Sequence, residues 1–398
     1  MSDSRVIISR RRFLQGLAAR IAVPAAAGFP AHALLAPVSP LVRGITRSPE
    51  GSYFTYPHAQ GFLPGGRCVV ARTILRPPGL EYLAFRPSTG ETIPIARVRD
   101  ARMYFALDKK GMLVFTRKHG VYMLDAGRSD SEPRPMHQDP PWVFHSDCDI
   151  SADGRQVLVT TSLADGQPPR HRVVMVDVSS GQAETLFEAD WLIDHAHFSP
   201  FDPNWIAFAS AESKRYQRLW VWHRVQAPEG RHLFRQRLSD GSVYDVGHER
   251  AMFDRPALLA IAYGSNSSAR PCGLFEVGFD GSSRLVSASN RDLHCNASRD
   301  GRWAVVSLQG TSENLMERIA PGWLDTPEGY GPSDVMVVNM RSGARQFLYR
   351  AYNSAMGQPY EVQPAISPDG RWVMVKDARE RCVLALEMDT TRLAAFLA

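Results

Sequence analysis

The phrase AISPDGRWVMV at residues 365–375 has close variants in DISADGRQVLV at 149–159 and NASRDGRWAVV at 296–306. In each copy, a β-rich segment runs into an Asp-Gly turn and then into a second β-rich segment. Glycine accepts the positive φ that tight turns require, so we expect each phrase to form a hairpin. Looser copies occur at 61–71 and 197–208.

Further β-rich segments follow these hairpins and turn again at Gly or Ser, as in HRVVMVDVSSGQAETLF at 171–187. Four strands thus recur over roughly 40–50 residues, which is typical of a propeller blade. We therefore predict an all-β fold, a seven-bladed β-propeller with four antiparallel strands per blade. Degenerate copies at 105–116 and 252–263 leave six or eight blades open. The predicted blades start near residues 53, 100, 143, 192, 245, 291 and 359.

The N-terminus resembles a twin-arginine signal. Arg10, Arg11 and Arg12 precede Phe13 and an Ala-rich apolar stretch, and the small-x-small site Ala-His-Ala ends at residue 33. We predict a signal peptide at 1–33 read by the twin-arginine export machinery, a lead-in at 34–50 that could close the ring, and a propeller domain at 51–398. The alternative is an ordinary N-terminus with incidental arginines. The apolar stretch is shorter than the roughly 20 residues that span a bilayer, so the exported protein is expected to be periplasmic or secreted, without membrane insertion.

The net charge and the cysteines argue against several classes of partner and site. Residues 1–33 carry +4 of the total charge of +5, so the exported chain would be nearly neutral at +1. No basic stripe or nucleic-acid motif follows, and we expect no nucleic-acid partner. The five cysteines are odd in number and widely spread, which indicates neither a disulfide framework nor a zinc site, although one bridge stays possible in the periplasm.

Residues from about 50 to 390 resemble the oligogalacturonate lyases, polysaccharide lyase family 22. The resemblance is carried by HAHFSPFDPNWIAF at 195–208, RLWVW at 218–222, GHE at 247–249 and HCNASRDGRW at 294–303. It implies a lyase of pectin degradation that cleaves uronate-containing oligosaccharides by β-elimination. Such a reaction requires a base for the C5 proton and a positive charge beside the uronate carboxylate.

The resemblance implies His248 as the base, because it matches the histidine of the family's His-Glu pair. Arg218 matches the family's charge-neutralising arginine. A histidine suits this role because its neutral form is well populated near pH 7. The alternatives are a turn histidine bonded to the backbone and an exposed strand arginine.

The family's metal ligands are a histidine of the preceding blade and a Gln-x-x-His-x-His run. His294 matches the first, and Gln358 matches the glutamine of the run. Glu361 and Gln363 stand where the family has histidines. The resulting set would suit a hard divalent cation such as Mn²⁺ or Ca²⁺. The alternative is a site that has lost its metal.

Other histidines lie near the predicted inner strands. His195 and His197 would point to one face of a strand, and His145, Asp147 and His58 stand at comparable positions in earlier blades. They indicate a polar channel mouth that suits an acidic oligosaccharide. The alternative function is a non-catalytic periplasmic propeller of the TolB or WD40 kind that binds a glycan or a protein. The two differ in whether the predicted site residues meet in one pocket.

Overall fold

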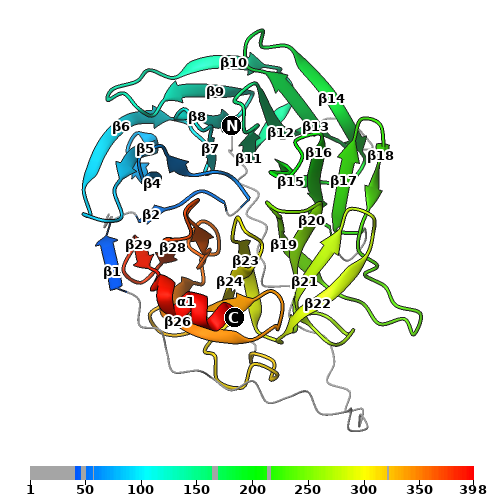
Figure 1. Ribbon diagram of the computed structural model, residues 1–398. Coiled ribbons are helices and arrows are strands. Elements are labelled where there is room, and N and C mark those ends of the chain that lie inside the picture. Colours follow the sequence, from blue (N-terminus) through cyan, green and yellow to red (C-terminus); the bar gives the residue numbers. More distant parts are fainter. Residues whose placement is uncertain (1–40, 46–50, 57, 164–168, 213–216, 321) are drawn as a thin grey trace.

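The computed structural model describes residues 41–45, 51–56, 58–163, 169–212, 217–320 and 322–398. The predicted signal peptide at 1–33 lies outside them. Seven small antiparallel sheets form a ring (Figure 1), which confirms the seven-bladed β-propeller. Five predicted blade starts lie within a residue of the first strand of a sheet. Blades two and seven begin later, at Phe105 and Ala365, because loops precede their first strands.

Each blade runs from an inner strand to an outer strand. The first blade contains β2 (Ser52–Tyr53), β3 (Phe62–Leu63), β4 (Arg67–Leu75), β5 (Pro78–Phe85) and β6 (Thr92–Arg99). The second contains β7 (Phe105–Leu107), β8 (Met112–Arg117), β9 (Gly120–Asp125) and β10 (Arg134–Gln138). The third contains β11 (Val143–Ile150), β12 (Gln156–Leu163), β13 (Arg170–Asp177) and β14 (Ala183–Ala189). The fourth contains β15 (Ile193–Phe198), β16 (Trp205–Ser210), β17 (Leu219–His223) and β18 (Ala227–His232).

The last three blades complete the ring. The fifth contains β19 (Val246–Ala251), β20 (Ala257–Ala262), β21 (Gly273–Gly278) and β22 (Ser283–Ala288). The sixth contains β23 (Asp292–Ala297), β24 (Trp303–Leu308), β25 (Tyr330–Asn339) and β26 (Arg345–Ser354). The seventh contains β27 (Ala365–Ile366), β28 (Trp372–Asp377), β29 (Cys382–Glu387) and β1 (Leu41–Ile45).

The two ends of the described chain meet in the seventh blade. Strand β1 pairs antiparallel with β29, with Leu41 opposite Glu387, and is the outermost strand of that sheet. The pairing joins the N-terminal side of the chain to the blade that contains the C-terminal strands. It therefore closes the ring with backbone hydrogen bonds.

The Asp-Gly phrases form the inner hairpins for a local reason. In the seventh blade, Ser367 Oγ donates to Asp369 and accepts from the backbone N–H of Trp372, while Gly370 has a φ of +69°. The same serine–aspartate arrangement recurs in the third and sixth blades. Side chains thus satisfy the turn's backbone groups, and glycine supplies the left-handed conformation.

The apolar core is divided among the seven blade interfaces. Each of seven buried hydrophobic clusters draws its residues from two neighbouring blades. Helix α1 (Thr390–Leu397) is the only helix of the described residues and adds Phe396 and Leu397 to the cluster between the sixth and seventh blades. The core thus lies between the sheets and leaves the inner strands free to present polar side chains.

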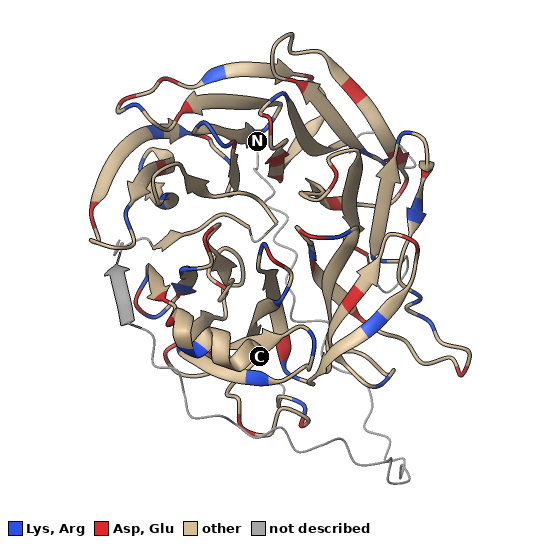
Figure 2. Ribbon diagram, viewed as in Figure 1, with Lys and Arg blue, Asp and Glu red and all other residues tan. Residues whose placement is uncertain are grey.

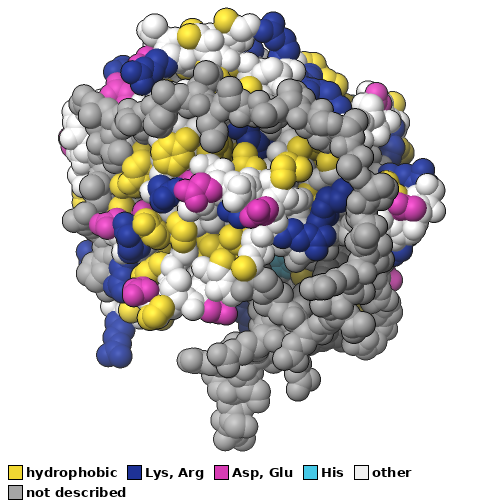
Figure 3. All heavy atoms as spheres, turned by 90° about the horizontal axis from the view of Figure 1, so that it is seen from below, with side chains coloured by type: hydrophobic (Ala, Val, Ile, Leu, Met, Phe, Trp, Pro, Cys, Tyr) yellow, Lys and Arg dark blue, Asp and Glu magenta, His cyan; other side chains and the backbone are white. Residues whose placement is uncertain are grey.

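The surface charges, the cysteines and the hydropathy of the helix can be described briefly. Acidic and basic residues are both spread over the blades (Figure 2), and both signs are scattered among apolar side chains on the face in Figure 3. All five cysteines are buried and none is disulfide-bonded, so the single bridge left open by the sequence does not form. In the part of the chain that the structure describes, we find no helix with the length and hydropathy to cross a membrane.

Candidate functional site

The inner strands of four successive blades are irregular at comparable places. Such irregularities are typical of β-bulges, which re-aim side chains near functional sites. His195 and His248 have positive φ values of +56° and +52°, which are uncommon for residues other than glycine. The pairing register shifts between Phe144 and Cys148, Asp194 and His197, Gly247 and Arg250, and Asp292 and His294.

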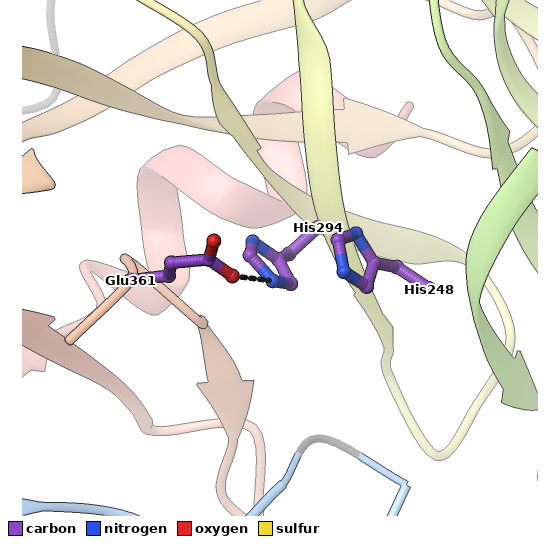
Figure 4. Close-up of side chains that lie close together, drawn as sticks. All are labelled: His248, His294 and Glu361. Carbon is purple, nitrogen blue, oxygen red and sulfur yellow. Dashed lines mark ion pairs between the residues drawn. The ribbon is translucent and has the colours of Figure 1, made fainter. Parts of the chain in front are cut away.

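His294, Glu361 and Gln363 lie together. His294 Nε2 is 3.3 Å from Glu361 Oε2 and 3.5 Å from the side-chain nitrogen of Gln363. The His248 ring stacks on that of His294 with centroids 3.7 Å apart, so β19, β23 and the loop before β27 meet here (Figure 4). Ligand-type atoms of His248, His294 and Glu361 lie within 4.8 Å of one another.

Gln358 joins this cluster through a tyrosine. The Tyr104 hydroxyl donates to Gln358 Oε1 at 2.9 Å and also interacts with Gln363. Gln358 is therefore linked to Gln363 through Tyr104, and it lines a cavity.

The His248 ring is held at one nitrogen. Nδ1 hydrogen-bonds the Leu293 carbonyl and lies 2.8 Å from the Tyr263 hydroxyl. Because the carbonyl can only accept, we assign the proton to Nδ1, which leaves the Nε2 lone pair free for chemistry. Burial, reinforced by His294, holds the pKa of His248 well below 6.5 and keeps the ring neutral.

Arg218 is buried, unlike the exposed strand arginine of the alternative interpretation. Its Nε lies 3.3 Å from Glu249 Oε2, and one terminal nitrogen donates to the Ser210 carbonyl at 2.9 Å. Burial alone would raise the pKa of Glu249, but Arg218 and His195 outweigh it and hold that pKa well below its usual range. The Glu249 carboxylate is therefore ionised and fixes the arginine.

The two neighbouring histidines do not behave alike. His195 Nδ1 lies 2.7 Å from Glu249 Oε1, and this histidine lines a cavity. His197 is fully buried, bonds the His195 carbonyl and stacks on His58. His195 and His197 therefore have different surroundings, because the left-handed backbone at His195 breaks the alternation of the strand.

A cavity of about 590 Å³ is lined by some of these groups. His248 and Arg218 both line it, and Tyr263 and Gln358 form other parts of its wall. Ala355, Met356 and Gly357, which follow β26, also line it. The predicted base and the predicted cation thus face one space that is large enough for part of an oligosaccharide.

Asp147 and Asp194 form a second polar group beside this cavity. His195 Nε2 is 3.9 Å from Asp147 Oδ2 and 3.8 Å from Asp194 Oδ2. Burial, then the neighbouring Asp194, raises the pKa of Asp147 well above its usual range. Burial by itself would raise the pKa of Asp194, but His195, Asp147, His145 and Arg218 together lower it.

Sequence reasoning missed Tyr56, Tyr104, Tyr263 and Asp194. Tyr56 is buried beside His195 with ring centroids 4.5 Å apart, and the Tyr263 hydroxyl contacts His248. Aromatic residues in β-rich phrases usually belong to the core, so the residue type alone does not distinguish these tyrosines from residues that only pack. A cue for Tyr56 was its place in the same short phrase as His58.

The donor set fits a hard or borderline divalent cation. A bound ion would take a carboxylate oxygen from Glu361 and an imidazole nitrogen from His294, with amide oxygens from Gln358 and Gln363 once these turn toward it. Oxygen-rich sets of this kind suit Mn²⁺, Ca²⁺ or Mg²⁺ better than soft metals. His248, the predicted base, adjoins the same cluster.

Comparison with solved structures identifies similar folds. An oligogalacturonate lyase in complex with manganese superposes with a TM-score of 0.68 and 13% identity, over 89% of this chain and 99% of that one. The fold resembles that of the oligogalacturonate lyases. The lyase from Vibrio parahaemolyticus gives a TM-score of 0.67 at 13% identity, over 89% of this chain and 100% of that one. The sequence matches no protein-family model and no curated protein sequence.

Proposed function

We propose that this protein is a polysaccharide lyase that cleaves uronate-containing oligosaccharides by β-elimination. The observation that carries the proposal is the cavity wall shared by His248 and Arg218, a neutral base and a buried cation. The fold likeness to the oligogalacturonate lyases supports it. Galacturonate oligomers are therefore the first substrates to test.

The reaction breaks two bonds and forms one double bond. The base takes the C5 proton, the C5–H electron pair becomes the C4–C5 π bond, and the C4–O4 bond breaks. The leaving oxygen carries away the glycosidic electron pair and takes up a proton. Negative charge develops on the C5 carboxylate, so the positive charge beside it lowers the barrier.

His248 would take the C5 proton at Nε2. Its Nδ1 proton is held by the Leu293 carbonyl, which fixes the ring during the transfer. The low pKa keeps the base unprotonated at neutral pH, so activity should fall only when the pH drops well below 6.5. The Tyr263 hydroxyl, 2.8 Å from the same Nδ1, would help to hold the ring while Nε2 takes the proton.

Arg218 would face the substrate carboxylate from the same wall. Its fork is held by Glu249 and the Ser210 carbonyl, so it needs no rearrangement to present its charge. Preorganised charge of this kind stabilises a transition state without reorganisation.

We also propose that His294, Gln358, Glu361 and Gln363 hold a divalent cation, Mn²⁺ or Ca²⁺. When bound, it would neutralise the uronate carboxylate. Twin-arginine export would bring the protein to the periplasm or medium.

The test is turnover of a panel of uronate oligosaccharides, measured by the absorbance of the unsaturated product. His248→Asn retains a donor toward the Leu293 carbonyl but has no Nε2, so the fold should be kept. General-base catalysis contributes roughly 10²–10⁴-fold, so kcat should fall by that factor while KM changes little. His232→Ala, an exposed histidine of β18, is the matched control and should leave kcat unchanged.

Neutral oligosaccharides of the same length should not react, because they have no carboxylate to acidify C5. Wild-type turnover by His248→Asn would disprove the base. Binding of uronates without any turnover by the wild type would instead identify a binding propeller.

A further inference from the structure

We propose that Asp147, Asp194 and His195 form a second divalent-cation site, separate from the His294 cluster. The three residues come from the inner strands β11 and β15 of two adjacent blades. One ligand-type atom of each lies within 4.8 Å of the others. This inference does not depend on the lyase function.

The spacing fits one ion. Oxygen ligands bind Ca²⁺ at about 2.3–2.6 Å, so two ligands of one ion can be as much as about 5 Å apart. His195 Nε2 lies 3.9 Å from Asp147 Oδ2 and 3.8 Å from Asp194 Oδ2, within that span. Asp194 and His195 also line the cavity, so an ion and its water ligands can enter from there.

Asp147 supplies an independent sign of a ligand. Its side chain is buried, and among the described residues its Oδ1 has no hydrogen-bond partner. A buried carboxylate oxygen without a donor is costly, and metal coordination is one of the few ways to satisfy it. The buried Tyr56 hydroxyl, whose ring packs on His195, is also without a partner within the described chain.

His195 is oriented as metal-binding histidines commonly are. Its Nδ1 faces the buried Glu249 carboxylate at 2.7 Å, which leaves Nε2 directed at the two aspartates. A carboxylate behind the imidazole fixes the tautomer and raises the ligand's basicity. Arg218 in turn anchors Glu249, so the support for His195 is itself rigid.

The charges of this group also favour a cation. Asp147, Asp194 and Glu249 are three carboxylates, and among the described residues Arg218 is the one arginine with an ion pair to any of them, through Glu249. Ligand-type oxygens of the two aspartates lie within 4.8 Å of each other. A divalent ion between them removes the repulsion without protonating either, and one imidazole with two carboxylates suits Mn²⁺.

The experiment counts Mn²⁺ ions on the full-length, chelator-treated protein by equilibrium dialysis with elemental analysis, and by the loss of the free-ion EPR signal. Asp147→Asn and, separately, Asp194→Asn should each lower the bound Mn²⁺ by one equivalent relative to wild type. Asp245→Asn, a carboxylate on the same cavity wall but outside the cluster, is the matched control and should lose none. Far-UV circular dichroism verifies that each variant folds; Asp194, which is partly exposed, is the safer substitution.

Glu361→Gln separates this site from the other one. If the inference is right, the Glu361→Gln variant still binds the one equivalent of Mn²⁺ that the Asp147→Asn and Asp194→Asn variants lose. If both aspartate variants bind as much Mn²⁺ as wild type, or if Glu361→Gln alone removes all binding, the inference is overturned. The cluster is then a proton-bridged ion-pair network.

Discussion

Replacing Glu249 by Gln should destabilise the propeller strongly, because it leaves the Arg218 charge buried without its counter-ion. The carboxylate is fully buried and Arg218 is only 9% exposed. At the observed 3.3 Å and an effective dielectric constant of about 20, the attraction is roughly 5 kcal/mol. Glutamine has nearly the same shape but keeps only one of the two acceptor oxygens, so the change removes the charge together with one hydrogen bond to Arg218 or His195.

Removing one partner of a buried pair typically costs about 3–5 kcal/mol, and we expect a loss of unfolding free energy in that range. Urea unfolding followed by tryptophan fluorescence measures it at pH 7. Glu188→Gln is the matched control, because Glu188 pairs with Arg170 through two hydrogen bonds at an exposed place on the third blade. It should change stability far less.

A loss below about 1 kcal/mol for Glu249→Gln would refute this reasoning, since it would mean that water screens the pair. Removing both charges together should be much milder than removing one, because no charge stays buried alone. A double-mutant cycle with Arg218→Met measures that difference.

Three further outcomes follow from other parts of the molecule. Deleting residues 1–45 should lower the melting temperature relative to deleting 1–40, because only the first removes the strand that closes the seventh blade; equal melting temperatures would contradict this role. Lys376 is buried, and burial lowers its pKa from 10.5 to about 7. Between these pH values the unfolded chain binds a proton at Lys376 that the folded chain does not, which destabilises the fold. Wild type should therefore gain about 4 kcal/mol relative to Lys376→Met as the pH rises from about 7 to 10, which urea unfolding at both pH values measures; a constant difference would argue against it. Replacing Arg10 and Arg11 by Lys should abolish export of a folded reporter fused to residues 1–40, and unchanged export would reject the signal.

Much of the fold was predictable because it repeats. Each copy of the Ser-x-Asp-Gly turn makes the same bonds, as Ser367 and Asp369 show, and the blades follow from their period. Blade two was placed early because its phrase at 105–116 has no such turn to mark it. Blade seven was placed early because residues 359–364 form a loop that carries site residues instead of a strand.

The sequence by itself determined the strand period, the hairpin turns and the residue types that could act as base, cation and ligands. It placed His248 and His294 in successive blades, but it did not bring them into contact. That contact was decided by the tertiary structure, because ring closure converts positions over 100 residues apart, such as His248 and Glu361, into neighbours around one axis. The bulges at His195 and His248 then turn side chains toward that axis. The period-two pattern of a strand does not predict these residues with left-handed backbone, so the sequence pattern did not reveal them.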